Sequence, residues 1–133
     1  MKTDAGVHGH HISQQFNQEL EEIKSSMLEM GGLVEHQLGD ALAALISADS
    51  ELGRTVRAND DAVNDMELNI DEACNRILAG RQPAASDLRL VLGIIKATND
   101  LERIGDEAAK IARLAIELAE QGDSSKGYVE IRH

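Results

Sequence analysis

Apolar residues recur at steps of three and four positions along three long segments of this chain. The first segment carries Phe16, Leu20, Ile23, Met27, Met30, Val34, Leu38, Ala41 and Leu45, the second Leu52, Val56, Val63, Met66, Ile70, Ala73 and Ile77, and the third Leu90, Ile94, Ala97, Leu101, Ile104, Ala108, Ile111 and Ala115. Such steps place the apolar side chains on one face of a helix, because a helix has about 3.6 residues per turn. The pattern therefore predicts three long amphipathic helices, and no strand pattern competes with them.

Turn-forming residues separate the three segments. Ala48-Asp49-Ser50 supplies a turn and a cap before the second helix. Gly80-Arg81-Gln82-Pro83 ends that helix, with Pro83 suited to the first turn of the third helix and Ser86 as the alternative cap. The third helix is expected to end before Gly122, which would act as its terminator. Long helices joined by short turns predict an all-α fold, an antiparallel up-down-up three-helix bundle.

The predicted bundle accounts for residues 1–122, and the composition changes after it. Residues 123–127 are rich in turn-forming side chains, and an apolar segment begins at Tyr128. We expect residues 123–133 to be a linker followed by the start of a second, missing repeat. The 133 residues are enough for one ordinary domain and leave no room for two.

The chain is strongly acidic, with a net charge of −11 and a pI near 4.7. Nucleic-acid binders and proteins that dock on anionic lipids need a basic face, so the charge argues against both kinds of partner. The single cysteine, Cys74, excludes an internal disulfide, and its apolar helical surroundings indicate buried packing. The longest apolar runs are too short to cross a bilayer and the amino terminus does not resemble a secretory signal, so we expect a cytoplasmic protein.

Two acidic pairs share one spacing, Glu67 with Asp71 in the second segment and Glu102 with Asp106 in the third. Residues four apart lie on one face of a helix, so each pair points two carboxylates the same way. If the two helices are neighbours, four carboxylates converge, and their oxygen atoms suit a hard or borderline cation. The spacing alone is no more frequent than chance gives in a chain with 24 acidic residues, and a solvated helix face is its simpler explanation.

The third helix carries a second line of residues that faces away from its predicted core stripe. Glu102 and Asp106 belong to this line, roughly opposite the core, whereas Glu67 and Asp71 lie at the edge of the core stripe of the second helix. Arg103 lies between the two acids and is expected either to form a surface ion pair or to contact a partner. Before Glu102 the line is apolar, and we expect it to bind a partner or further copies of the chain, in a symmetric dimer or a larger oligomer. Its apolar residues are Leu88, Val91, Leu92 and Ile95.

Several longer segments of the chain are distinctive, and they read HHISQQFN at 10–17, MGGLVE at 30–35, NIDEAC at 69–74, RQPAASDLR at 81–89 and LERIGD at 101–106. Together these segments resemble the amino-terminal half of the PhoU family of phosphate-signalling proteins. The resemblance runs across essentially the whole chain. It implies one of two tandem three-helix bundles, each with a Glu/Asp-x-x-x-Asp motif on two helices where family members bind metal ions at the surface.

Carried over to this chain, the motif falls on Glu67, Asp71, Glu102 and Asp106, with Asn99 and Asp100 as further oxygen donors. The resemblance leaves the ion open among magnesium, manganese, iron and zinc. It implies a negative regulator of phosphate uptake and of phosphate-responsive two-component signalling. The expected partners are the ATPase subunit of the phosphate transporter and the phosphate-sensor histidine kinase.

Two other functions remain open at this point. A plain structural adaptor would use its acidic face for solubility alone. A carboxylate-bridged di-iron protein needs Glu-x-x-His on two helices, and the one such spacing in the sequence joins Glu130 to His133. The sequence shows no glycine-rich phosphate loop and no nucleophile beside a base, so we expect a binding protein and not an enzyme.

Overall fold

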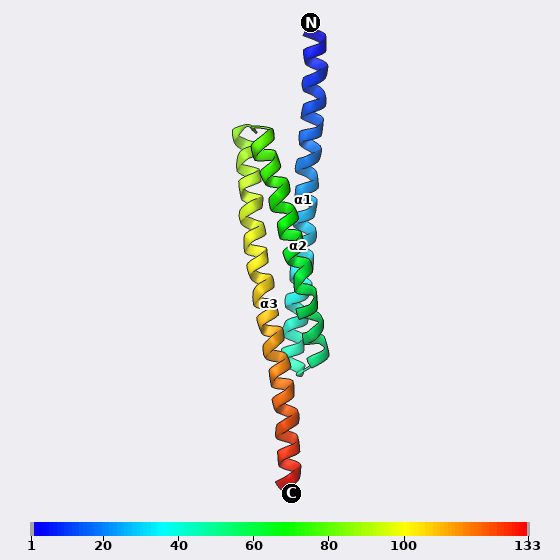
Figure 1. Ribbon diagram of the computed structural model, residues 1–133, viewed down its shortest axis with the longest axis vertical. Helices are drawn as coiled ribbons and strands as arrows, with labels where there is room; N and C mark the ends of the chain where they lie inside the picture. The colour runs from blue at the N-terminus through cyan, green and yellow to red at the C-terminus, as the bar shows by residue number, and fades with distance from the viewer. Residues whose placement is uncertain (1, 133) are drawn as a thin grey trace.

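The computed structural model describes the backbone of residues 2–132 and the side chains of residues 14–122. It contains three helices, α1 (Lys2–Ser47), α2 (Ser50–Gly80) and α3 (Ala85–Arg132), and the described residues form no strand. The chain reverses direction at each of its two turns, so α1 and α3 run the same way and α2 runs against them (Figure 1). Every helix contacts the other two, which confirms the predicted all-α, up-down-up bundle.

The turn between α1 and α2 is built as the sequence predicts. Ala48 adopts a positive φ of 52°, which reverses the chain, and Asp49 takes the extended conformation of a helix cap. The backbone amide of Leu52 donates to Oδ1 of Asp49 at 3.1 Å. This bond satisfies one of the amides at the start of α2 that have no partner within the helix.

Replacing Asp49 with alanine should lower the free energy of unfolding by about 1 kcal/mol, because the amide of Leu52 loses its acceptor. Urea unfolding followed by far-ultraviolet circular dichroism measures the change. Asp49→Asn is the control, because asparagine caps helices about as well as aspartate does. An equal loss in both variants would mean that the charge of Asp49, and not the cap, carries the effect.

The second turn differs in detail from the sequence-based prediction. α2 ends at Gly80, and the next amide, that of Arg81, still donates to the carbonyl of Ile77 at 3.0 Å. α3 begins at Ala85, and the amide of Leu88 donates to the carbonyl of Ala84 at 2.8 Å. Pro83 therefore precedes the helix instead of lying in its first turn, and Ser86 lies within the helix instead of capping it.

α3 also continues past Gly122, where it was expected to end, and reaches Arg132. A terminating glycine usually adopts a positive φ, and no described glycine does so. Glycine within a helix costs only about 1 kcal/mol relative to alanine, so Gly122 alone does not stop a helix that proline does not interrupt. That residues 123–133 lead into a second repeat stays a prediction.

The core changes character along the bundle. Towards the α2–α3 turn it is filled by large apolar side chains, including Met30, Ile70 and Ile77. Towards the α1–α2 turn its centre consists of Ala41, Val56, Ala108 and Ala112. Small side chains allow the helices to approach more closely at this second end.

Among the glycines of the described residues, Gly53 has the closest neighbours, at a contact between α2 and α3. A Cβ atom at this glycine would lie 3.0 Å from the carbonyl oxygen of Ala112 and 3.0 Å from Cγ1 of Ile116. The carbonyl oxygen belongs to the backbone of α3 and cannot rotate away. The absence of a side chain at Gly53 therefore sets the separation of the two helices at this level.

Two sequence-based assignments on α3 are wrong. Ile104, placed in the core stripe, is 41% exposed, and Val91, placed on the partner-binding line, is fully buried. The buried face of α3 is centred on small residues such as Gly105, Ala108 and Ala112, where the neighbouring helices come closest. The predicted core stripe runs through large apolar side chains such as Ile104, so it is rotated about the helix axis away from the face that is buried.

Among the described residues, no helix combines the length and the apolar character needed to cross a membrane.

Candidate functional site

α2 places Glu67 and Asp71 at the edge of its buried stripe, as the sequence predicts. Both side chains are half-buried, and Ile70, which is buried in the main core, lies between them in the sequence. Packing of Ile70 against the core fixes the rotation of α2 about its axis. This rotation directs both carboxylates into the groove between α2 and α3.

α3 places Glu102 and Asp106 beside the same groove and not behind the core, so that part of the prediction is wrong. Gly105 lies between them and is buried. A Cβ atom on Gly105 would lie 3.2 Å from Cγ1 of Val63 on α2. The missing side chain lets the two helices approach at this level, which turns both acids of α3 towards α2.

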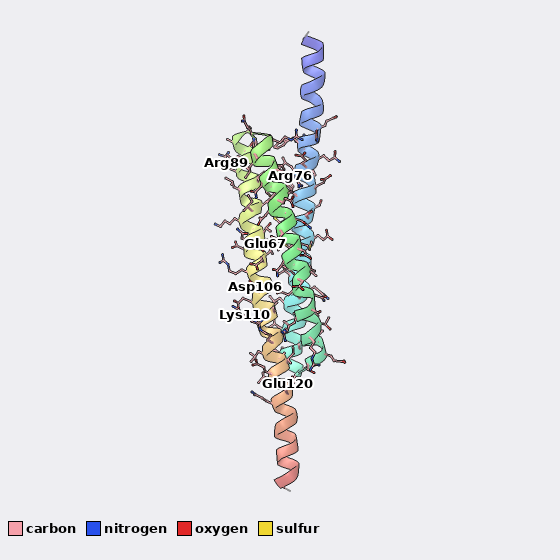
Figure 2. All side chains as sticks on the ribbon, viewed as in Figure 1. Glu67, Arg76, Arg89, Asp106, Lys110 and Glu120 are labelled. Carbon is pink, nitrogen blue, oxygen red and sulfur yellow. The ribbon has the colours of Figure 1, made fainter. Side chains whose placement is uncertain are left out.

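The four carboxylates interact electrostatically. Burial is the first cause that raises the pKa of Glu67, followed by the negative charges of Asp71 and Asp106. Burial also raises the pKa of Glu102, assisted by a hydrogen bond and a charge interaction with Asp106 and by the charge of Glu67. Figure 2 shows Glu67 on α2 and Asp106 on the neighbouring α3. The structure thus brings the two predicted acidic pairs together.

A fifth acid, Asp60, belongs to the same group and was not found from the sequence. Its pKa is raised by burial first, then by the charges of Asp106 and Asp61, while Arg113 lowers it. Asp60 also raises the pKa of Glu102. The signal was present in the sequence, because Asp60 precedes Glu67 by seven residues, two helical turns, and so shares its face.

The acidic groove, which we define as Asp60, Glu67, Asp71, Glu102 and Asp106, contains two carboxylate oxygens without hydrogen-bond partners in the described part of the chain. Oδ1 of Asp60 and Oδ1 of Asp71 are both buried, and neither has a hydrogen-bond partner among the described residues. A buried carboxylate oxygen without a donor is costly, and the cost is relieved by a proton or a cation. The chemistry of the groove therefore favours a positively charged ligand.

The five carboxylates are spread along the groove and do not surround one point. Within residues 14–122, no three side chains of His, Cys, Asp or Glu are placed so that they could hold one metal ion. An ion that binds here needs one or more glutamates to change rotamer. Each such change costs at most about 2 kcal/mol of side-chain ordering.

The other candidate ligands of α3 are Asn99 and Asp100, and Asp100 lies away from this group. Asp100 precedes Glu102 by two residues, which turns it about 200° around the helix. Its side chain is 55% exposed and lies 3.9 Å from the guanidinium of Arg103. Asn99 is also exposed. Arg103 therefore forms the surface ion pair that was one of its two expected roles.

The apolar line expected to bind a partner is only partly available. Leu88 is 37% exposed and Leu92 is 49% exposed, whereas Val91 is fully buried. Ile95 is half-buried and packs against the main core. Two of the four residues thus present an apolar surface beside the α2–α3 turn.

Cys74 is fully buried and has no disulfide partner. Burial raises the pKa of its thiol to about 11, and the charge of Asp71 adds to the shift. The thiol therefore stays protonated near neutral pH and fills space in the core, as predicted.

The side chains of Glu130 and His133, on which the di-iron alternative depends, lie outside the described residues.

Comparisons with known proteins identify the family. Residues 27–115 match the model of the PhoU domain. The chain belongs to the PhoU family. It is 66% identical over 124 residues to the phosphate-specific transport system accessory protein PhoU homolog of Pseudomonas putida, a match that covers 93% of this chain and 48% of the relative.

Solved structures of PhoU proteins share the fold. The crystal structure of PhoU from Pseudomonas aeruginosa is 64% identical in sequence and superposes with a TM-score of 0.79, over 89% of this chain and 56% of that one. The phosphate transport system regulatory protein PhoU from Streptococcus pneumoniae is 40% identical, with a TM-score of 0.71 over 76% of this chain and 48% of that one. The chain spans about half the length of the curated relatives that it matches.

Proposed function

We propose that this PhoU-family chain is a regulatory accessory protein of phosphate transport and acts as a negative regulator of uptake and of phosphate-responsive two-component signalling. The observation that carries the proposal is its 66% identity, over 93% of its length, to a protein named as an accessory protein of the phosphate-specific transport system. The relative from Streptococcus pneumoniae is named a regulatory protein of the same system. Neither name describes an enzyme, which supports a binding role.

We infer two protein partners, the ATPase subunit of the phosphate transporter and the phosphate-sensor histidine kinase, both contacted in the cytoplasm. An acidic surface without aromatic clusters suits protein partners and cations better than nucleic acids. The proposal covers only the contacts that the bundle described above can make, since the chain spans about half the length of its relatives.

We further propose that the acidic groove holds a divalent or trivalent metal ion. The donor set fits, because it consists of carboxylate oxygens, two of which are buried without a partner. Glu67, Glu102 and Asp106 would supply the central ligands, with Asp60 and Asp71 on either side along α2. A bound cation supplies charge neutralisation between α2 and α3 and so stabilises a surface that a partner can recognise.

Metal content and partner capture test these proposals together. The chain purified after exposure to manganese, iron, zinc or magnesium should retain metal, and Glu102→Gln with Asp106→Asn should lower the retained metal at least about tenfold. Asp65→Asn with Glu117→Gln removes two exposed acids from the same helices and should change nothing. Capture of the purified transporter ATPase and of the kinase, with and without chelator, should depend on the metal.

Unchanged metal content in the Glu102→Gln, Asp106→Asn variant would contradict the metal proposal. Partner capture that persists in chelator would then favour the alternative of a plain structural adaptor. The absence of three converging ligands among the described side chains is the observation that favours this alternative.

Self-association is a separate proposal that follows from Leu88 and Leu92. Their exposed surface should be buried in a symmetric dimer, which sedimentation equilibrium of the purified chain would detect. The paired changes Leu88→Glu and Leu92→Glu should weaken the dimer about a hundredfold or more, since each buried leucine contributes about 1.5–3 kcal/mol. Leu28→Glu, at an exposed apolar position of α1, is the control. A chain that remains monomeric at high concentration would rule this dimer out.

A further inference from the structure

A wide groove between α1 and α2 is separate from the acidic groove and has no role so far. It has a volume of about 1110 Å³. Its apolar floor includes Ile23, Ile70 and Ile77, which belong to the main core. Ala73 also lines it and follows Asp71 by two residues, which turns it about 200° around α2. The two grooves therefore lie on opposite sides of α2.

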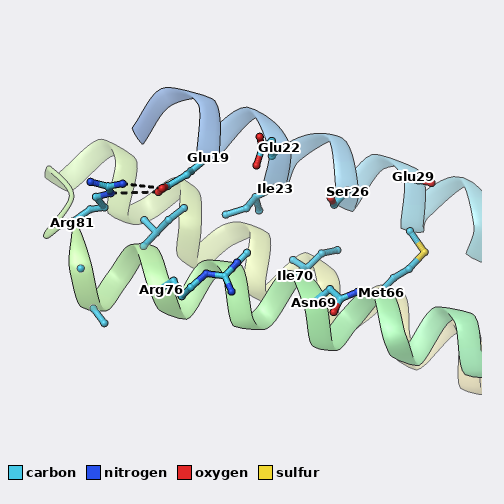
Figure 3. Close-up of a pocket in the computed structure, with 14 residues that line it drawn as sticks. Glu19, Glu22, Ile23, Ser26, Glu29, Met66, Asn69, Ile70, Arg76 and Arg81 are labelled. Atoms are coloured by element: carbon cyan, nitrogen blue, oxygen red, sulfur yellow. Dashed lines mark hydrogen bonds and ion pairs between the residues drawn. The ribbon is translucent and has the colours of Figure 1, made fainter. Parts of the chain in front are cut away.

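Paired contacts fix how α1 and α2 face each other across this groove. At one end the guanidinium of Arg81 donates to both carboxylate oxygens of Glu19, at 2.8 and 3.4 Å (Figure 3). Further along the bundle, Nε2 of Gln37 donates to the carbonyl of Asn59 at 3.0 Å. Counting along antiparallel helices from these contacts places Ser26 level with Ala73. Two small side chains thus face each other in the middle of the groove.

The wall formed by α1 is acidic. Glu19, Glu22 and Glu29 line it, with Ser26 between the last two (Figure 3). Glu19 is neutralised by Arg81, at 2.8 Å. Glu22 and Glu29 are exposed, and neither forms an ion pair or hydrogen bond within the described part of the chain.

The wall formed by α2 does not neutralise these two glutamates. Its cation Arg76 lies 3.3 Å from Glu72 on its own helix. Arg81 pairs with Glu19, and the other residues that line this wall, Asn69 and Ala73 among them, carry no charge. The groove therefore has an apolar floor, small residues at its centre and two unneutralised negative charges along one side.

We propose that this groove binds an amphipathic helix of a partner protein that carries basic residues along one edge. Glu22 and Glu29 are seven residues apart, about 10.5 Å along the helix axis, and an aligned helix repeats its side chains at the same interval. Two lysines or arginines seven residues apart on the occupant meet the two glutamates. Its small or apolar residues enter between Ser26 and Ala73, in the helix-in-groove manner.

The dimensions and charge of the chain support this occupant. The groove extends at least from Glu19 to Glu29, about 15 Å along α1, which is close to three turns of helix. The net charge of −11 attracts a basic segment from a distance and speeds its encounter with the protein. The inference rests on the proposed role of the chain as a protein-binding regulator, and it does not depend on a bound metal.

A synthetic peptide tests the proposal. The probe is a fluorescein-labelled amphipathic helix of about 18 residues with leucine and alanine on one face and two lysines seven residues apart. Fluorescence anisotropy should show saturable one-to-one binding to the full chain. A peptide with glutamates in place of the lysines should not bind.

Variants within and outside the groove locate the binding site. Ser26→Trp fills the centre of the groove and should weaken binding at least about tenfold, whereas Ser25→Trp, at the adjacent exposed position outside the groove, should not. Glu22→Gln with Glu29→Gln should weaken binding about fivefold, since each exposed ion pair contributes under about 1 kcal/mol. Glu21→Gln with Glu35→Gln, on other faces of α1, is the charge-matched control. Circular dichroism confirms that every variant is folded.

The results distinguish this proposal from its alternatives. Equal losses in both glutamine pairs would show non-specific charge attraction and overturn it, as would no saturable binding up to about 1 mM peptide. Self-association that Ser26→Trp abolishes and Ser25→Trp leaves intact would identify a second copy as the occupant and also overturn it. Ser26 is remote from the acidic groove, so metal content should be the same in Ser26→Trp and the unmodified chain, and failure here leaves the metal proposal standing.

Discussion

Replacing Gly53 with leucine should destabilise the bundle by about 3 kcal/mol or more, the upper part of the range for overpacked cores. A Cβ atom at this position already lies 3.0 Å from the carbonyl oxygen of Ala112 and 3.0 Å from Cγ1 of Ile116. The longer leucine side chain can be accommodated only if α2 and α3 move apart. Their separation opens the contacts among Val56, Ala108 and Ala112 in the smaller core cluster.

Gly32→Leu is the matched control, because nothing lies within 4 Å of a Cβ atom at Gly32. Leucine is a better helix former than glycine, so this variant should gain up to about 1 kcal/mol. Urea unfolding of both variants gives the two changes in the free energy of unfolding. A Gly53→Leu variant as stable as the unmodified chain would show that the α2–α3 contact is not tight in solution.

The fold could be predicted from the sequence because its signals are local. Three apolar stripes predict the three helices, and residues that favour turns and helix caps, such as Asp49, predict the first turn. Local signals fail where several conformations are acceptable to the same residues. Gly122 can end a helix by adopting a positive φ, but it is also accepted within a helix, and α3 continues through it.

The rotation of α3 could not be predicted, because it depends on contacts between helices. The sequence projection included the large side chain of Ile104, but the neighbouring helices pack on Gly105 and Ala112, which it left out. This rotation buries Val91 and brings Glu102 to the groove. Which face of an alanine-rich helix is buried depends on how the side chains of the neighbouring helices pack against it. The sequence of α3 alone does not contain this information.

The acidic pairs could be named from the sequence, but their surroundings could not. Spacing suggested Glu67 with Asp71 and Glu102 with Asp106 at no more than the chance frequency, and only the family resemblance distinguished these pairs as a candidate site. Asp60 was missed because it has no acid four residues away and joins the group through charges on another helix. The groove also requires the close approach at Gly105, which only the folded bundle shows.

The stability of the metal-free chain should decrease as the pH rises from about 4 towards neutrality. The pKa values of Asp60, Glu67 and Glu102 are raised from ordinary values of 3.8, 4.5 and 4.5, with burial as the first cause and neighbouring carboxylates next. In the pH range above the ordinary values the folded state therefore holds protons that the unfolded state has released. Under this condition the free energy of unfolding falls with increasing pH, until the raised pKa values are passed.

A cation should restore the stability that is lost, because it replaces the protons in the acidic groove. At a metal concentration of about 100 times Kd, binding to the folded state alone adds about 2.7 kcal/mol to the free energy of unfolding. Urea unfolding at several pH values, with chelator and then with manganese, iron, zinc or magnesium, measures both effects. The metal that acts at the lowest concentration is the preferred ion.

Glu67→Gln with Glu102→Gln should remove both the loss of stability with rising pH and its recovery on the addition of metal. The neutral amides neither repel the remaining acids nor bind a cation strongly. In this variant the free energy of unfolding at neutral pH in chelator should rise, and the addition of metal should give less than half of the original gain. Asp65→Asn with Glu117→Gln, one exposed acid from each of the same helices, should keep the pH dependence and the response to metal. If both double variants respond alike, the cation acts on the overall negative charge of the bundle, and the carboxylates between α2 and α3 do not form a specific site.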